Sequence, residues 1–203
     1  MKIKTVALTL LAAGAVSSAA VAAPATAPAA APIATGPAIA GVCIVNNDYI
    51  LGGSQVGKFV ITRLQQLKSQ VDAEINSEGT ALQADAKTLQ GQRASLSNEQ
   101  YEQKIGALQV RDQALQRKIQ LREREMQATQ EKAFGTIGQQ ADPIVRQVIG
   151  ERTCSLVLNG AAVVVANPAM DLSPIIVQRL DAKIQQFAFE REHLDTAAAG
   201  AAH

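Results

Sequence analysis

The residues nearest to a catalytic motif lie just after a short apolar run near the start of the chain. Residues 52–58, GGSQVGK, nearly match G-x-x-x-x-G-K-[ST], the phosphate-binding loop of nucleotide hydrolases. That loop needs a hydroxyl directly after the lysine to hold Mg²⁺, and Phe59 takes its place here. No alternation of helices and parallel strands follows. The sequence argues against an ATPase, and we expect Gly52, Gly53 and Gly57 to mark a flexible passage from strand to helix.

Other groups that could catalyse a reaction are scarce. The only histidines are His193 and His203, within or beside the low-complexity C-terminal end. The sequence therefore offers no histidine within its predicted folded segments to act as the base for a nucleophile or as a zinc ligand. Acid pairs such as Glu123 and Glu125 fall in a polar helical pattern, where a solvated helix surface is the expected interpretation. We predict that the protein is not an enzyme and uses no cofactor and no catalytic metal.

The first 22 residues indicate export. Lys2 and Lys4 precede an apolar run and then a stretch of small residues, which is the order of a secretory signal peptide. Cleavage is predicted near Ala22, and the apolar run is shorter than the about 20 residues that span a bilayer. The uncharged Ala/Pro-rich residues 23–40 are predicted to form a flexible leader. Loss of the two signal lysines changes the balance from 19 basic and 18 acidic residues to 17 and 18, so nothing indicates nucleic-acid binding.

A long polar segment, residues 53–149, carries a thin helical stripe of apolar side chains at steps of three, four or seven. Gly91 is placed to end a first helix, and Ser97 with Gln100 matches a capping box that starts a second. Two helices joined by so short a loop must run antiparallel for their stripes to meet. We predict a protruding helical hairpin, each helix extending more than about 50 Å. A solvated coiled-coil spacer is the plainest interpretation of such a segment.

The two ends of the sequence are predicted to form one small β body. Residues 41–52 supply a strand at Val42 to Val45. Residues 150–190 supply a β-hairpin, with strands 155–158 and 161–166 around an Asn-Gly pair, and then a C-terminal helix. The predicted fold class is therefore α+β, with the helical hairpin protruding from the body.

The C-terminal helix has its own start signal and apolar face. Ser173 is predicted to cap it, with Pro174 at its first position. Its apolar face consists of Ile176, Leu180, Ile184 and Phe187. Residues 191–203 are predicted to be a disordered tail. Packing of the body, and of a trimer formed through it, is assigned to Ile44, Val45, Val157 and Val164.

The two cysteines, Cys43 and Cys154, each lie in or beside a β-like segment of the base. Export favours oxidation, and the helical hairpin leaves the base and returns to it, which brings the two segments together. We therefore predict a disulfide between them. Two small buried thiols are the alternative.

The order of these segments resembles the Skp/OmpH family of periplasmic chaperones. The similarity covers about residues 41–187, and its most specific parts are Ile44-Val45-Asn46 and the segment SLVLNGAAVVVANPAMDLS, residues 155–173. It implies a jellyfish-like homotrimer in the periplasm, whose helical hairpins project as tentacles around a cavity. It also implies an ATP-independent holdase that keeps unfolded outer-membrane proteins from aggregating in that cavity.

The apolar side chains of the helical hairpin are the candidate client contacts, and Leu115, Ile119 and Met126 represent them. Well-known members of the family are strongly basic and this chain is not, so binding of lipopolysaccharide or phospholipid is not carried over and membrane-surface contact is left open. The main alternative is a structural or adaptor coiled-coil protein of the cell envelope. Such adaptors usually carry lipoyl-like and barrel segments, with many more β residues than this chain has.

Overall fold

A computed structural model of the chain describes residues 35–194. The predicted signal peptide, most of the predicted leader and the end of the predicted tail lie outside these residues. Along the chain the elements are β1 (Val42–Val45), α1 (Asn47–Gly53), α2 (Gln55–Gly91), α3 (Asn98–Glu151), β2 (Leu156–Asn159), the 3₁₀ helices η1 (Gly160–Ala162) and η2 (Pro168–Met170), and α4 (Ser173–Lys183).

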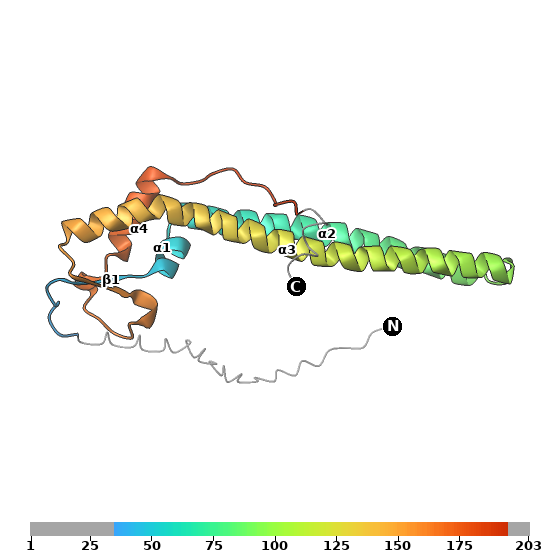
Figure 1. Cartoon of the computed structure of the whole chain (residues 1–203), viewed down its shortest axis with the longest axis horizontal. Helices are drawn as coiled ribbons and strands as arrows, with labels where there is room; N and C mark the ends of the chain where they lie inside the picture. The colour runs from blue at the N-terminus through green and yellow to red at the C-terminus, as the bar shows by residue number, and fades with distance from the viewer. Residues whose placement is uncertain (1–34, 195–203) are drawn as a thin grey trace, which may run out of the picture. The chain divides into compact units, whose positions relative to one another are not determined.

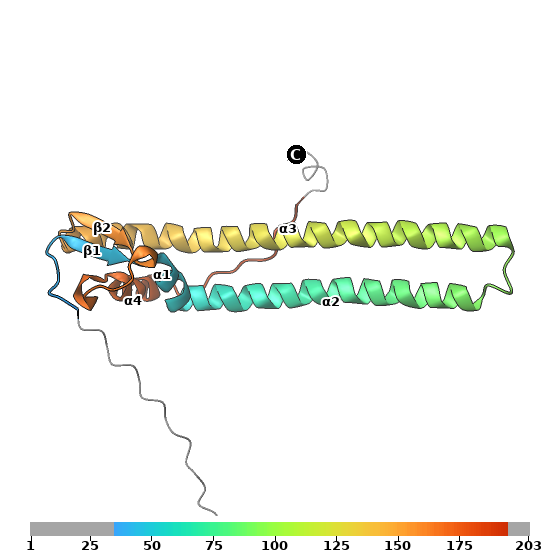
Figure 2. The same ribbon diagram turned by 90° about the horizontal axis from the view of Figure 1, so that it is seen from below.

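The helices α2 and α3 form the predicted hairpin (Figure 1, Figure 2). With 37 and 54 residues they extend about 55 and 80 Å at 1.5 Å per residue. Helix α2 ends at Gly91, as predicted. The predicted capping box is also confirmed, because the Ser97 hydroxyl accepts from the Gln100 N–H while the Gln100 side chain accepts from the Ser97 N–H. The local signals therefore set both helix ends at the tip.

The sheet of the body differs from the predicted one. Strand β1 pairs in parallel with β2, with Cys43 opposite Val157, and the predicted β-hairpin at 155–158 and 161–166 is wrong. The chain instead turns into η1 after Asn159, whose side chain accepts from the Ala161 N–H. Gly160 packs so tightly that a Cβ there would lie 2.6 Å from the Asn46 Cβ. This cap and close approach replace the expected two-residue turn.

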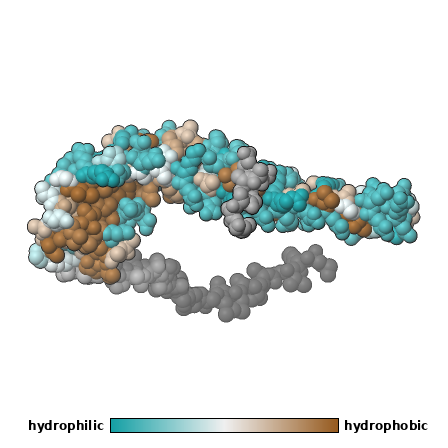
Figure 3. Space-filling model, in the orientation of Figure 1, coloured by the Kyte–Doolittle hydropathy of each residue, from teal (hydrophilic) through white to brown (hydrophobic). Residues whose placement is uncertain are grey.

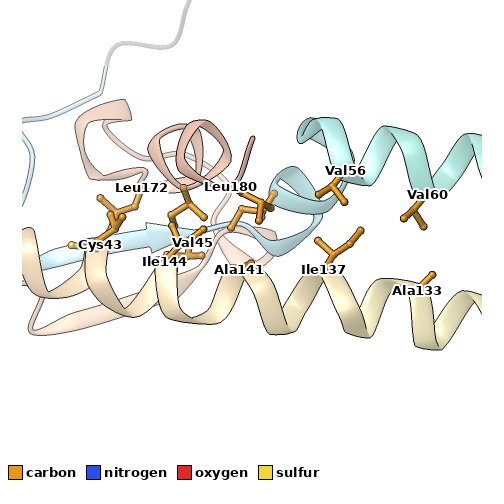
Figure 4. Packing of buried hydrophobic residues seen from close by; sticks show 13 residues of the cluster. Cys43, Val45, Val56, Val60, Ala133, Ile137, Ala141, Ile144, Leu172 and Leu180 are labelled. Atoms are coloured by element: carbon orange, nitrogen blue, oxygen red, sulfur yellow. The ribbon is translucent and has the colours of Figure 1, made fainter. Parts of the chain in front are cut away.

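The core lies where α1, α4, β1 and the two body-proximal helix ends meet (Figure 4). Its centre consists of fully buried aliphatic side chains, among them Val56, Val60, Ile137, Val148, Ile176 and Leu180. The predicted body residues Ile44 and Val45 are also buried within this single chain. Removing such side chains from water is the main stabilising term for the body.

The prediction that Gly52, Gly53 and Gly57 mark a flexible passage from strand to helix is wrong. Residues 47–53 form helix α1, and the Ser54 side chain caps α2 by accepting from the Gly57 N–H. A Cβ on Gly57 would lie 1.5 Å from the Leu51 carbonyl oxygen. This glycine is thus required by close helix packing, and the segment is neither a phosphate loop nor a loose linker.

The start and end of α4 also differ from the prediction. Leu172 occupies the cap position, while the Ser173 hydroxyl accepts from the Asn46 N–H at 2.8 Å and donates to Asp171. The serine therefore joins the helix to β1 instead of capping it. Helix α4 ends at Lys183, and residues 184–194, which we call the strap, contain neither helix nor strand. The strap thus includes Ile184 and Phe187 and the first residues of the predicted tail.

Candidate functional site

A groove of about 800 Å³ lies between α2 and α3 on one side of the helical hairpin. Its floor is apolar and consists of Ile61, Leu64, Val71, Ile75, Ile119, Met126 and Phe134. Its rim carries the amides Gln65, Asn76, Gln127 and Gln130 and the charged residues Lys68, Asp72, Arg122 and Glu123. No peptide segment of the described residues fills this groove.

Helix periodicity explains why the groove exists. Its α2 residues follow steps of three and four, so they share one face of the helix. The apolar stripe is narrow, and only its innermost members, such as Leu67 and Val71, are buried between the helices. Ile61 remains 39% exposed. A stripe of this width holds two helices together but leaves apolar surface open at its edge.

The predicted client contacts fall in two places. Ile119 and Met126 line the groove about two helical turns apart on α3. Leu115 lies nearer the tip, beside Leu82, and its Cδ2 would be 3.9 Å from a Cβ placed on Gly79. The structure thus brings two of the three residues together in one groove, and Leu115 packs between the helices outside it.

The strap runs along the body-proximal part of the hairpin (Figure 1). It contacts Arg63, Glu125 and Thr129, which lie on helix faces other than those that line the groove. On α2, Arg63 binds both carboxylate oxygens of Glu190, at 2.7 and 2.8 Å, and its Nε donates to the Phe189 carbonyl at 3.5 Å. Phe187 and Phe189 pack against the core cluster. Sequence analysis missed this contact because it predicts Phe187 on the apolar face of the C-terminal helix and a disordered tail from residue 191.

The strap also contacts α3, where it buries a carboxylate. The Thr129 hydroxyl accepts from the Glu192 N–H at 2.8 Å, and a carboxylate oxygen of Glu125 accepts from the Leu194 N–H at 3.2 Å. Glu125 is only 2% exposed, whereas Glu123 is exposed at the groove rim. The expected solvated surface is therefore confirmed for Glu123 and wrong for Glu125, because the strap covers the latter.

A network of charged groups connects the strap to the groove. Arg122 lines the groove, binds both oxygens of Glu74 at 2.9 and 3.1 Å, and donates to Glu125 at 2.9 Å. Arg191 of the strap lies 3.3 Å from Glu125 and 3.5 Å from Glu74. Hydrogen bonds from Arg122 and then Lys118 lower the pKa of Glu74 to about 2. Glu74 therefore stays ionised at neutral pH. The network joins α2, α3 and the strap.

A second apolar surface lies on the body. Leu156, Val157 and Leu158 of β2 are 37–52% exposed, and Val164 is 97% exposed. Within the described residues β2 pairs only with β1, so its other edge is open. Figure 3 shows hydrophobic residues gathered over the body and a mostly hydrophilic hairpin. Of the predicted packing residues, Ile44 and Val45 serve the core of one chain, while Val157 and Val164 remain available.

Cys43 and Cys154 form a disulfide with their Cα atoms 5.8 Å apart. The bond joins β1 to the segment after α3 and closes a loop of 111 residues that contains the whole hairpin. In the chain-entropy model, closing a loop of this length stabilises the folded state by about 4 to 5 kcal/mol. The base of the hairpin is thus fixed covalently on both sides.

The described residues contain no cluster of three or more His, Cys, Asp or Glu side chains that could hold a metal ion. Within residues 35–194, no helix combines the length and apolar character needed to cross a bilayer.

A small body with a long helical hairpin and a parallel strand pair built from both ends of the chain defines the OmpH-like class. Residues 41–180 match the family described as outer membrane protein (OmpH-like), and the chain belongs to this family. It is similar to the crystal structure of an OmpH-like outer membrane chaperone from Caulobacter crescentus, with 40% sequence identity and a TM-score of 0.77. That similarity covers 82% of this chain and 99% of the Caulobacter chain. Comparison with curated proteins gives no significant match.

Proposed function

We propose that the protein is an ATP-independent holdase chaperone of the periplasm, which binds unfolded outer-membrane proteins and prevents their aggregation. The observation that carries this proposal is the open, apolar-floored groove on the long hairpin of an OmpH-like chain. The likeness to the Caulobacter OmpH-like chaperone supports the same conclusion.

The chemistry of the clients explains why such a groove is useful. Strands of outer-membrane barrels have apolar outward faces, so the unfolded chains aggregate in water unless these faces are covered. A groove with scattered Leu, Ile, Val and Met contacts binds many sequences weakly, and several such contacts together give avidity. Release then needs no nucleotide, because insertion into the membrane is a more stable final state.

We also propose a homotrimer assembled through the body. An open strand edge and exposed apolar side chains on β2 are liabilities in an isolated chain, and pairing between copies covers them. The exposed residues Val157 and Val164 are the ones proposed to make this contact, and the three hairpins would then project around a shared cavity.

The test of this function is an aggregation assay on the mature protein. A urea-unfolded outer-membrane barrel protein is diluted into buffer with and without the chaperone, without ATP, and light scattering and solution mass are followed. We expect suppressed scattering and a complex with the mass of three chains and one client. An unfolded helical protein of similar size is the control, and unchanged aggregation of the barrel protein would contradict the proposal.

A further inference from the structure

We propose that the open groove binds its client as one extended segment with alternating apolar and polar residues, in the manner in which the strap lies on the other side of the hairpin. This inference rests on the proposed holdase function and specifies the conformation and residue pattern that the groove accepts.

The strap is an extended chain bound by the same two helices. Between residues 187 and 191 its side chains alternate: Phe187, Phe189 and Arg191 are half-buried, whereas Ala188 and Glu190 are exposed. The alternation ends at Glu192, which is also half-buried. This period of two is that of a β-strand. Residues 187–191 of the strap therefore have one face toward the hairpin and one toward solvent.

Hairpin side chains, and not a neighbouring strand, bind the main chain of the strap. Thr129 and Glu125 accept from the N–H groups of Glu192 and Leu194, which are two residues apart, and Arg63 donates to the Phe189 carbonyl. Side chains on α2 and α3 can thus satisfy the peptide groups of an extended segment without any β partner. This matters because buried peptide groups without hydrogen bonds are costly.

The open groove offers the same two kinds of contact at the same level of the hairpin. Its apolar floor can take every second side chain of a bound segment. Its rim amides, Gln65, Asn76, Gln127 and Gln130, each carry both donors and an acceptor, so they can bond to N–H or C=O groups in any register. The groove differs from the strap side in that residues of the chain itself already cover the latter.

The dimensions agree with a short strand segment. The lining residues of α2 run from Ile61 to Asn76, which corresponds to about 22 Å along the helix. An extended chain of that length contains about seven residues at 3.3 Å each. A barrel strand of about ten residues alternates between lipid-facing apolar and lumen-facing polar side chains, so one such strand would fill the groove.

The first experiment compares two labelled nine-residue peptides of identical composition, one alternating Val with Thr and one with all valines before all threonines. Fluorescence anisotropy with the mature wild-type protein is expected to give a Kd about tenfold lower for the alternating peptide. Equal affinities would overturn the inference, because an apolar surface without a preferred residue pattern does not distinguish the alternating peptide from the block peptide.

Variants then locate the binding. Ile119→Gln combined with Met126→Gln is expected to weaken binding of the alternating peptide about tenfold or more, since two apolar contacts are lost. The matched control is Val110→Gln, an exposed position on α3 outside the groove lining, which should leave the affinity unchanged. Unchanged binding by the double variant would overturn the groove assignment. Far-ultraviolet circular dichroism checks that both variants remain folded.

A cross-link provides a readout that does not depend on destabilising changes. A photo-reactive residue replacing Gln130 at the rim should capture the alternating peptide, whereas one replacing Gln113, outside the groove lining, should not. Equal capture, capture at neither position, or capture of a second copy of this chain instead of the peptide contradicts the inference. If the double variant still suppresses barrel aggregation, the holdase proposal survives while the groove inference fails.

Discussion

At the scale of single residues, two glycines five positions apart, Gly52 and Gly57, have opposite roles. Gly57 faces the Leu51 carbonyl at a distance that no Cβ can occupy, whereas Gly52 has nothing within 4 Å of a Cβ position. Sequence alone gave the two the same interpretation, since both lie in a glycine-rich run between strand and helix. The difference comes from the packing of α1 on α2, which is a tertiary feature.

These two glycines provide a matched pair of substitutions. We expect Gly57→Ala to lower the free energy of unfolding by about 3 kcal/mol or more, because helix backbone must move to accommodate the methyl group. Gly52→Ala should be neutral or should stabilise helix α1 by up to about 1 kcal/mol. Urea unfolding followed by circular dichroism measures both, and equal stabilities of the two variants would contradict the packing described for Gly57.

Glu74 is the residue through which acidity should affect the hairpin. Its pKa is lowered from 4.5 to about 2, first by Arg122 and then by Lys118. A carboxyl group with a lowered folded-state pKa stabilises the protein above its unfolded pKa, and this contribution is lost as the pH falls from 4.5 through 2. Because Glu74 is 31% exposed, solvent screening reduces the value expected from the shift to about 1 to 2 kcal/mol.

We therefore expect Glu74→Gln to lower the free energy of unfolding by about 1 to 2 kcal/mol at pH 7. The difference from wild type should shrink between pH 4.5 and pH 2. Urea denaturation at pH 7, 4 and 2.5 measures this, with the exposed Glu102→Gln as the control for loss of one negative charge. A stability difference that does not depend on pH would show that Glu74 acts through packing alone.

At the scale of elements, the sequence predicts what local signals determine and fails where distant segments decide. The hairpin ends follow from Gly91 and the Ser97–Gln100 box, both of which act within one turn. The Asn159-Gly160 pair is an equally strong local signal for a β-hairpin. In the structure, however, β2 pairs in parallel with β1, and the Asn-Gly pair starts η1, where Gly160 packs against Asn46. The groove could be predicted only as a thin apolar stripe, without its rim.

The strap was the largest omission among the elements. Its alternation of Phe187, Phe189 and Arg191 was the available signal, but the helical spacing of Ile184 and Phe187 favoured a longer C-terminal helix, followed by a disordered tail from residue 191. The acceptors Thr129 and Glu125 lie more than 60 residues away, so no local pattern shows them.

A chain that ends after Gln186 tests what the strap stabilises. We expect faster amide hydrogen exchange in residues 63–74 and 125–136, where the strap binds, and unchanged exchange in residues 101–118 nearer the tip. The physical reason is that the strap joins α2 to α3 through Arg63, Thr129 and Glu125, all of which lie in residues 63–74 and 125–136. Uniform acceleration along the whole hairpin would indicate that the strap supports the core instead.

At the scale of the whole molecule, the described residues combine a core that is buried within one chain with an exposed apolar surface on the body. Ile44 and Val45 are buried in one chain, whereas Val164, five residues after the end of β2, is 97% exposed. A residue this exposed contributes little to the stability of a single chain. A substitution of Val164 should therefore leave the fold of one chain intact, so it tests assembly separately from folding.

Val164→Asp should dissociate the proposed trimer by placing a charge in an apolar interface, while each chain keeps its helical hairpin and its disulfide. Analytical ultracentrifugation of wild type and variant at the same concentration measures the mass, and circular dichroism measures the helix content. Val110→Asp is the control, because it makes the same change at an exposed site on α3, far along the hairpin from the body. A trimer that persists in Val164→Asp, or a wild-type protein that is a monomer, would exclude this surface as the assembly interface. If dissociation also abolishes suppression of barrel aggregation while peptide binding to the groove remains, the shared cavity is needed to hold a whole client and each groove binds only a segment.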